Sequence, residues 1–251
     1  MRAKQNQNGR VFYQGKSALD GSPIVGIATG LRSSSKNSKT GALIPTYIMR
    51  SDIAPHKAIY SGEDESVCGD CRHRRIWNPD TEQFDRTCYV NVSKAPFMIF
   101  KCYARGGYPH ATPSEMADIV AGRPVRLGAY GDPAAIPFEV WEGMLSKQGK
   151  RSIVGYTHQL EHENFDPRIL AYCMVSADTP EEASHAREIG ARAYLVRPHG
   201  STLPKGFTQC PAAEEAGKRT TCVSCLLCGG NSVSGKSISI LAHGKQGARF
   251  E

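Results

Sequence analysis

No stretch of this 251-residue sequence is apolar for long enough to cross a membrane, and no apolar segment opens the chain as a signal peptide would. These absences argue against a secreted protein, so the nine cysteines are not expected to form a disulfide framework. We expect reduced thiols in a cytosol, where they are available to bind metal. The apolar content of 40% is enough for a hydrophobic core, which argues against global disorder.

Acidic residues are scarce in the first part of the chain. Residues 1–60 carry nine Lys or Arg against two Asp, which accounts for the whole net charge of +7, and residues 61–251 are balanced. We expect a basic N-terminal segment, residues 1–60, packed on a single α/β domain of residues 61–251. Its loop from Gly30 to Gly41 interleaves hydroxyls with cations, so it could bind phosphate, a nucleotide or a nucleic-acid backbone. The composition also suits a solvated surface loop, and no aromatic residue is present there for base stacking.

Four cysteines fall within nineteen residues near the C-terminus: Cys210, Cys222, Cys225 and Cys228. The last three have the spacing C-x2-C-x2-C, and thiolates gathered this closely repel one another unless a metal ion neutralises them. Structural zinc usually uses two C-x-x-C pairs a dozen or more residues apart. Three crowded cysteines with an outlying Cys-Pro are more typical of a [4Fe–4S] cluster, so iron–sulfur is favoured over zinc. We predict a cluster-binding segment at residues 210–230.

A second group consists of Cys68, Cys71 and Cys88, with sixteen residues between the last two. These three cysteines could hold a second cluster with one iron open, or a closed site completed by His73. The alternative is an inert pair and a core thiol. Two further cysteines, Cys102 and Cys173, stand in apolar surroundings and are expected to be small buried hydrophobic residues.

From residue 112 onward, strands and helices are expected to alternate, which predicts a parallel sheet with helices outside it. Capping boxes begin helices at Thr112 and at Thr179, and a third helix follows Pro137. The segment 95–105 could be a helix or a strand. The expected strands are residues 45–49, 125–130, 152–157, 169–176, 193–197 and 237–242.

Polar residues follow most of these strands. In a complete or partial β/α barrel the C-terminal ends of the strands meet at the active site, so Asp132, His158 and Asp178 are candidate catalytic residues. The alternative is structural: Asp132 could cap a helix, and Asp178 could stabilise a helix N-terminus. Polar residues at the later strand ends are Arg197, His199 and His243.

One motif is set aside. Residues 230–237 match the phosphate-loop pattern G-x-x-x-x-G-K-S. That loop requires a buried strand before it and a helix after it, whereas here a cysteine segment precedes it and a strand is expected to follow. ATP binding by this loop is therefore not expected.

Several segments together resemble the gene-product-88 family of bacteriophages and prophages of actinobacteria, above all the cysteine segment 210–230 and V-R-L-G-A-Y-G-D-P, G-Y-T-H-Q and V-S-A-D-T-P-E-E-A. The resemblance covers about residues 41–244 and implies a phage protein in the cytoplasm of a bacterial host. More distantly, the strand ends and cysteines are similar to radical S-adenosylmethionine enzymes, which have a partial β/α barrel and a three-cysteine cluster. Their usual C-x3-C-x2-C spacing is absent here, which argues against carrying over S-adenosylmethionine cleavage.

Two functions remain open. The first is an enzyme: a partial (β/α) barrel with iron–sulfur clusters, acting on a nucleotide, a nucleic acid or a related phage substrate. The second is a non-catalytic metalloprotein, in which the segment 210–230 staples the C-terminal part and the basic segment binds nucleic acid or a host protein. Polar residues at the strand ends favour the enzyme, because a structural module would not need them. The sequence leaves catalysis, the substrate and the number of clusters open.

Overall fold

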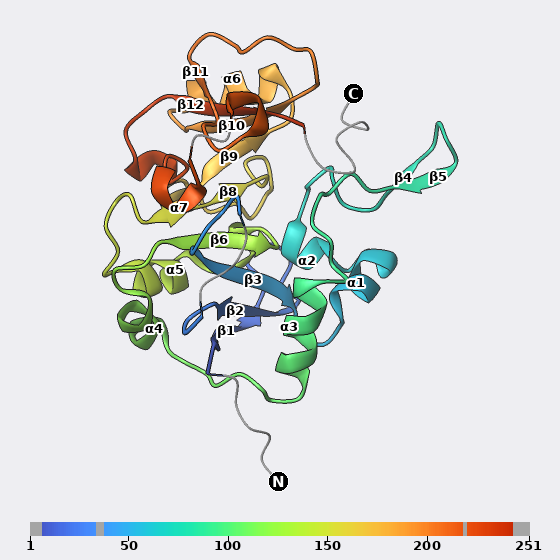
Figure 1. Ribbon diagram of the computed structural model, residues 1–251. Helices are drawn as coiled ribbons and strands as arrows, with labels where there is room; N and C mark the ends of the chain where they lie inside the picture. The colour runs from blue at the N-terminus through green and yellow to red at the C-terminus, as the bar shows by residue number, and fades with distance from the viewer. Residues whose placement is uncertain (1–6, 34–37, 218–219, 243–251) are drawn as a thin grey trace.

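The chain folds into two five-stranded β-sheets and a separate two-stranded hairpin, with helices packed beside the sheets (Figure 1). A computed structural model describes residues 7–33, 38–217 and 220–242. Within these residues no helix is long and apolar enough to span a membrane. The fold is thus mixed α/β, with mainly parallel strands.

The first sheet begins with an antiparallel meander and continues with parallel strands. Its order is β1-β2-β3-β6-β7; β1, β2 and β3 pair antiparallel, and β3, β6 and β7 pair parallel. The strands are β1 (Gly9–Lys16), β2 (Pro23–Thr29), β3 (Ile44–Arg50), β6 (Val125–Tyr130) and β7 (Ile153–Val154).

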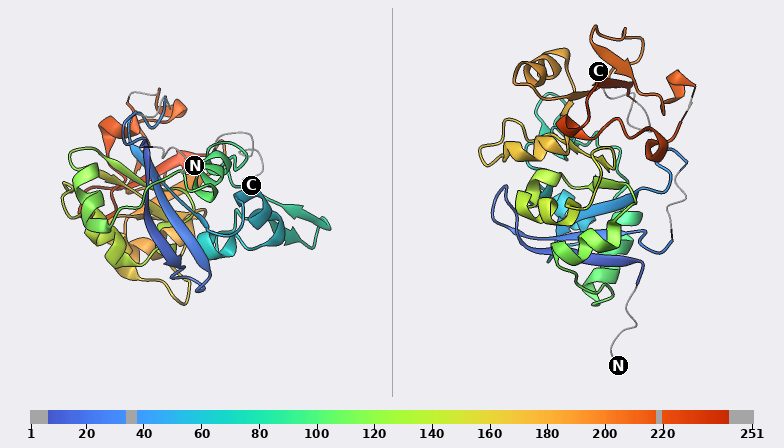
Figure 2. Two further views of the ribbon diagram at one scale, coloured as in Figure 1. Left: turned by 90° about the horizontal axis from the view of Figure 1, so that it is seen from below. Right: turned by 90° about the vertical axis from the view of Figure 1, so that its left-hand side faces the viewer.

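The second sheet is parallel throughout and has the order β11-β12-β10-β9-β8. Its strands are β8 (Tyr156–Thr157), β9 (Met174–Ala177), β10 (Ala193–Arg197), β11 (Phe207–Gln209) and β12 (Ser237–Leu241). The separate hairpin, β4 (Ile76–Asn78) and β5 (Gln83–Asp85), extends away from the body of the molecule (Figures 1 and 2).

Gly155 joins the two sheets, because it is the single residue between β7 and β8. Its carbonyl oxygen accepts a hydrogen bond from the Met174 amide (3.0 Å), so pairing with the next strand begins where β7 ends. A Cβ atom at this position would lie 2.6 Å from the Cys173 sulfur, which explains why glycine is required there. In the spatial order β3-β6-β7 and β8-β9-β10-β12-β11, each strand pairs parallel with the next. The parallel series thus runs through both sheets.

Each sheet buries both faces. Trp141 packs against Phe12 at 5.1 Å between ring centroids, and its indole N–H donates to the Pro133 carbonyl. This places α4 and α5 on one face of the first sheet, and α3 covers the other. On the second sheet α6 packs on one face and the cysteine segment 210–228 covers the opposite face. The helices are α1 (Pro55–Ser61), α2 (Glu65–Cys68), α3 (Ala95–Ala104), α4 (Pro113–Val120), α5 (Phe138–Leu145), α6 (Pro180–Glu188) and α7 (Cys222–Cys225).

Most of the expected helices and strands are confirmed. The two helix starts predicted at Thr112 and Thr179 are confirmed as well. Thr112 and Glu115 form a complete capping box at α4. At α6 the Thr179 hydroxyl accepts from the Glu182 amide, but the Glu182 carboxylate accepts from the Asp178 amide instead of the Thr179 amide. The segment 95–105, left open between helix and strand, is helical.

Two expectations about the strands were incomplete. The segment 169–176 is a strand only from Met174, because the Asp166 carboxylate accepts from the Arg168 amide and starts a 3-10 helix at Pro167–Ala171. Its apolar residues are buried in either conformation, so the apolar run alone could not distinguish them. The strands β1 and β2 were not expected, and they make part of the basic N-terminal segment the edge of the first sheet.

The tight contact at Gly155 predicts a cost for any side chain at that residue. We expect Gly155→Ala to lower the free energy of unfolding by about 1–3 kcal/mol, because the added methyl group overlaps the Cys173 sulfur. Gly149→Ala is the matched control, since its Cβ would meet only the Ser152 hydroxyl at 3.5 Å. Urea unfolding of both variants measures the difference. Equal stabilities would show that the junction tolerates a side chain.

Candidate metal-binding cavity

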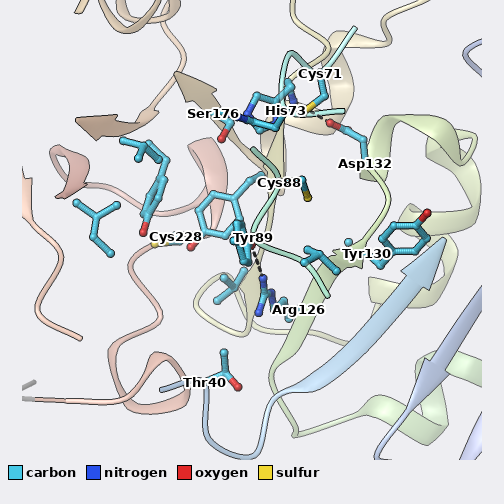
Figure 3. A pocket seen from close by; sticks show the side chains of 18 of the residues that line it. Thr40, Cys71, His73, Cys88, Tyr89, Arg126, Tyr130, Asp132, Ser176 and Cys228 are labelled. Atoms are coloured by element: carbon cyan, nitrogen blue, oxygen red, sulfur yellow. Dashed lines mark hydrogen bonds between the residues drawn. The ribbon is translucent and has the colours of Figure 1, made fainter. Parts of the chain in front are cut away.

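A cavity of about 430 Å³ lies over one face of the parallel strands (Figure 3). Seven of the nine cysteines line this cavity. Side chains alternate across a strand, so residues two apart share a face. Tyr156 and His158, and Ser176 and Asp178, are such pairs on and just beyond β8 and β9. The cavity therefore occupies the face of the second sheet opposite to α6. The cysteines that line it are Cys68, Cys71, Cys88, Cys210, Cys222, Cys225 and Cys228.

The first cysteine group, Cys68, Cys71 and Cys88, lies on the chain that follows β3. Cys68 ends α2, and Cys71 donates its amide to the Cys68 carbonyl at 3.1 Å. Cys88 is brought back to this turn by its amide, which donates to the His73 carbonyl at 3.0 Å. After burial, the charges of Cys71 and Cys88 also raise the pKa of Cys68, and Cys88 raises that of Cys71. Two segments separated by sixteen residues thus form one group.

Burial raises the pKa of Cys71 to about 12, although its sulfur accepts a hydrogen bond from the His73 backbone. Burial also raises the pKa of Cys68 well above its usual value. Without a cation these thiols remain protonated at neutral pH. A bound metal ion would displace their protons and neutralise the thiolates.

Gln159 holds the turn between Cys68 and Cys71 against the end of β8. Its side chain is fully buried; Nε2 donates to the Cys68 carbonyl (2.7 Å), and Oε1 accepts from the Asp70 amide (3.0 Å). A Cβ at Gly69 would lie 1.9 Å from Oε1, and this residue has a positive φ of 49°. Glycine therefore allows the turn to approach the amide closely. This role of Gln159 was not predicted from the sequence.

The second cysteine group, Cys210, Cys222, Cys225 and Cys228, is tied to both sheets by backbone hydrogen bonds. The Cys210 amide donates to the Ser239 carbonyl of β12, and the Gly155 amide donates to the Cys228 carbonyl. Cys222 begins α7 and donates its amide to the Lys39 carbonyl. These contacts hold the four cysteines around one end of the cavity.

Electrostatic interactions show that the four sulfurs are neighbours. Burial raises the pKa of Cys228 to about 12, against the hydrogen bond that its sulfur accepts from the Tyr156 hydroxyl, and Cys210, Cys222 and Cys225 raise it further. Burial likewise raises the pKa of Cys210, whose sulfur accepts from the Ala212 backbone. Backbone N–H and hydroxyl donors directed at sulfur stabilise a thiolate, which is the form that binds metal.

Within the described residues, no three sulfurs of either group all lie within 4.8 Å of one another. In the described part of the chain only His73, His158 and Asp178 bring three ligand atoms within 4.8 Å of one another. A zinc ion with Zn–S bonds of about 2.3 Å would separate its sulfurs by about 3.8 Å. A cluster of several irons and sulfides holds its thiolates further apart.

His73, His158 and Asp178 meet at the C-terminal ends of β8 and β9. His73 Nε2 lies 3.0 Å and His158 Nε2 3.7 Å from Asp178 Oδ2. Burial lowers the pKa of His158, which keeps its imidazole neutral at pH 7. Burial acts to raise the pKa of Asp178, but the hydrogen bond from His73 and the nearby histidines bring it below its usual value. Asp178 is therefore a carboxylate that faces the neutral imidazole of His158.

Asp132, expected beside His158 and Asp178, lines the same cavity but is occupied by amide donors. Oδ1 accepts from the Ala134 amide (3.0 Å), and Oδ2 accepts from the His158 amide (2.8 Å). It therefore caps a 3-10 helix at Pro133–Ala135, as the structural alternative predicted, and positions His158. The side chain that lies beside His158 and Asp178 is that of His73. From the sequence, His73 was expected only as a possible ligand beside the cysteines.

The remaining candidates lie elsewhere. Arg197 donates to Ser239 and Gln209, which stabilises the edge of the second sheet, and His199 is exposed and does not line the cavity. His243 lies outside the described residues. In the phosphate-loop match, β12 follows Lys236 where the motif requires a helix, so the strand expected after this motif is confirmed. Cys102 and Cys173 are buried in apolar clusters, as expected.

The polar loop from Gly30 to Gly41 reaches the second cysteine group. Lys39 and Thr40 line the cavity, and the Thr40 carbonyl accepts from the Val223 amide at 3.2 Å. Residues 34–37 of this loop are outside the described part of the chain. The loop therefore contributes backbone to the cysteine site, besides any role of its hydroxyls and cations.

Comparison of the chain with protein-family models, with curated proteins and with solved structures found no match. A function for this chain is therefore inferred from the residues around the cavity.

Gln159 provides a test of how the first cysteine group is held. Gln159→Met keeps the length of the side chain but removes two hydrogen bonds: the one to the Cys68 carbonyl, which keeps the Cys71 amide as a donor, and the one from the Asp70 amide. A typical intramolecular hydrogen bond contributes about 0.5–1.5 kcal/mol, so we expect a loss of about 1–3 kcal/mol of unfolding free energy. Gln83→Met, at an exposed position of β5, is the control and should change stability by less than about 0.5 kcal/mol. Indistinguishable urea midpoints would contradict this role for Gln159.

Proposed function

We propose that this protein is an iron–sulfur protein with a cluster-binding site at each end of one cavity. Cys210, Cys222, Cys225 and Cys228 supply the four thiolates of a [4Fe–4S] cluster. Cys68, Cys71 and Cys88 supply three ligands for a second cluster with one iron open to the cavity. The convergence of seven cysteines from two distant segments on one cavity is the observation that supports this proposal most strongly.

Charge explains why a metal suits these groups. Burial raises the pKa values of Cys68, Cys71, Cys210, Cys222 and Cys228, so these thiols can ionise only if a cation compensates them. The basic residues that line the cavity near the second group are Lys39 and Arg126. The outlying Cys210-Pro211 favours a cluster over a single zinc ion. The hydrogen bonds to the sulfurs of Cys71, Cys210 and Cys228 are of the kind that tune cluster potentials.

The fold we propose is a partial (β/α) barrel of the radical-enzyme type. Parallel strands from β3 to β11, with the cavity on one face and polar residues at the strand ends, support it. The Cys68–Cys71 turn follows β3, the first strand of the parallel series, which is where such enzymes carry their three-cysteine loop. The spacing of Cys68, Cys71 and Cys88 still differs from theirs, so S-adenosylmethionine is not part of the proposal.

A nucleotide or part of a nucleic acid is the substrate class that we propose. Tyr130, Tyr156 and Tyr194 offer aromatic faces along the cavity, and such faces suit the stacking of a base. Arg126 lies among them; it donates to the Tyr89 hydroxyl (3.1 Å), whereas its buried Nε–H donates no hydrogen bond. This guanidinium could bind a phosphate. As the resemblance to the gene-product-88 family implies, we propose that this takes place in the cytoplasm of a phage-infected bacterium.

One observation favours the second candidate function, a non-catalytic metalloprotein. The segment 210–228 supplies the apolar cover of one face of the second sheet through Ala212, Ala213 and Leu227. A metal bound there would staple this cover in place, as structural metal sites do. In that case the basic residues of the N-terminal segment would bind nucleic acid or a host protein.

Metal and sulfide analysis of anaerobically purified protein tests the cluster assignment. We expect brown protein with broad absorbance at roughly 400 nm and acid-labile sulfide in about equal amount to iron, because thiolate-bound clusters contain both. Colourless protein that contains zinc and no sulfide would reject the cluster and leave the metalloprotein alternative.

The triple variant Cys68/Cys71/Cys88→Ala tests whether the first group holds a cluster of its own. If two clusters are bound, we expect its iron content to fall by about half, with the cluster of the second group retained. Cys102→Ala is the control, because Cys102 is a buried thiol outside the cavity, and it should keep the full iron content. Unchanged iron in the triple variant would show that the first group binds none, and the likeness to radical enzymes would lose its support.

A further inference from the structure

Two imidazoles and a carboxylate meet in the cavity without using any cysteine. The ligand atoms of His73, His158 and Asp178 all lie within 4.8 Å of one another. Asp178 Oδ2 lies between the two rings, 3.0 Å from His73 Nε2 and 3.7 Å from His158 Nε2. Metal–nitrogen and metal–oxygen bonds of about 2.0–2.2 Å place neighbouring ligand atoms about 3.0–3.4 Å apart. The observed distances bracket this range.

Hydrogen bonding within the protein does not account for this arrangement. His158 Nε2 is buried and has no hydrogen-bond partner, and the same is true of Asp178 Oδ1. Only 4% of the Asp178 side chain is exposed to solvent. A buried polar atom without a partner is unfavourable, and a ligand that binds both residues would remove this cost.

The surroundings fix the orientation of the three side chains. The Thr87 hydroxyl lies 2.6 Å from His73 Nδ1, so that Nε2 is the nitrogen directed at Asp178. The His158 backbone is held by the Asp132 carboxylate, and the Asp178 amide donates to the Glu182 carboxylate. Partners that hold the far side of a ligand in this way are typical of metal sites.

We propose that His73, His158 and Asp178 bind one divalent transition-metal ion, with the remaining coordination positions open to the cavity. Two imidazoles and one carboxylate form a donor set that suits Fe²⁺, Zn²⁺ and similar ions. Three protein ligands leave room for water or for an oxygen or nitrogen atom of a bound molecule. This site is independent of the proposed clusters, because no cysteine is among its ligands.

Cobalt(II) is a suitable probe, because it occupies such sites and can be counted separately from iron. Anaerobically prepared full-length protein is treated briefly with a chelator, dialysed against Co²⁺ and analysed for cobalt per chain. We expect one bound cobalt with nitrogen and oxygen ligands, and therefore no strong sulfur-to-cobalt charge-transfer band in the difference spectrum. Failure to bind cobalt, or binding accompanied by that band, would overturn the proposal.

Matched variants locate the cobalt. Asp178→Asn and His158→Gln keep the side-chain shape and should each weaken cobalt binding by at least about tenfold, since each removes one ligand. The controls are Asp118→Asn and His185→Gln, two exposed residues paired with Lys147 and Glu161, and they should bind cobalt as the wild type does. Near-ultraviolet circular dichroism checks folding; if His158→Gln is unfolded, the isosteric Asp178→Asn decides alone. Undiminished cobalt binding in folded Asp178→Asn would refute the site.

Discussion

The extended segment 153–157 is the constraint on which the rest of the structure depends. Gly155 allows β7 to pair with one sheet and β8 with the other, because a side chain there would overlap the Cys173 sulfur. Its amide also binds the Cys228 carbonyl, so the same residue anchors the second cysteine group. The segment continues into His158 and Gln159, which reach the first cysteine group and the His–Asp cluster. One strand thus sets the relative position of both ends of the cavity.

Burial and hydrogen bonding have opposite effects on the pKa values of the thiols in this cavity. Burial raises the pKa of Cys68, Cys71, Cys210 and Cys228, whereas donors such as the Tyr156 hydroxyl favour the thiolate. Apolar packing alone would need neither the donors nor the gathering of seven thiols. The metal binding that we propose would reconcile the two, because a cation would neutralise the thiolates.

Helix starts and strands that depend on neighbouring residues were predicted correctly from the sequence. The capping box at Thr112, the strand 125–130 and the strand 193–197 depend on neighbouring residues and are confirmed. All seven cysteines of the two groups line one cavity, which the spacing within either group does not predict. Asp132 and His73 could not be assigned, because their roles depend on contacts 26 and 105 residues away along the chain. Sequence spacing does not report such contacts.

The size of the cavity limits what can act there. A volume of about 430 Å³ lies within the range of small-molecule pockets, about 300–1,000 Å³. Clusters on the cysteines would occupy part of it, so the remaining space suits a small molecule or a single nucleotide, and not a duplex. If the substrate is a nucleic acid, one nucleotide must leave its stack to reach Tyr156 and Asp178. The remaining strand would then lie outside the cavity.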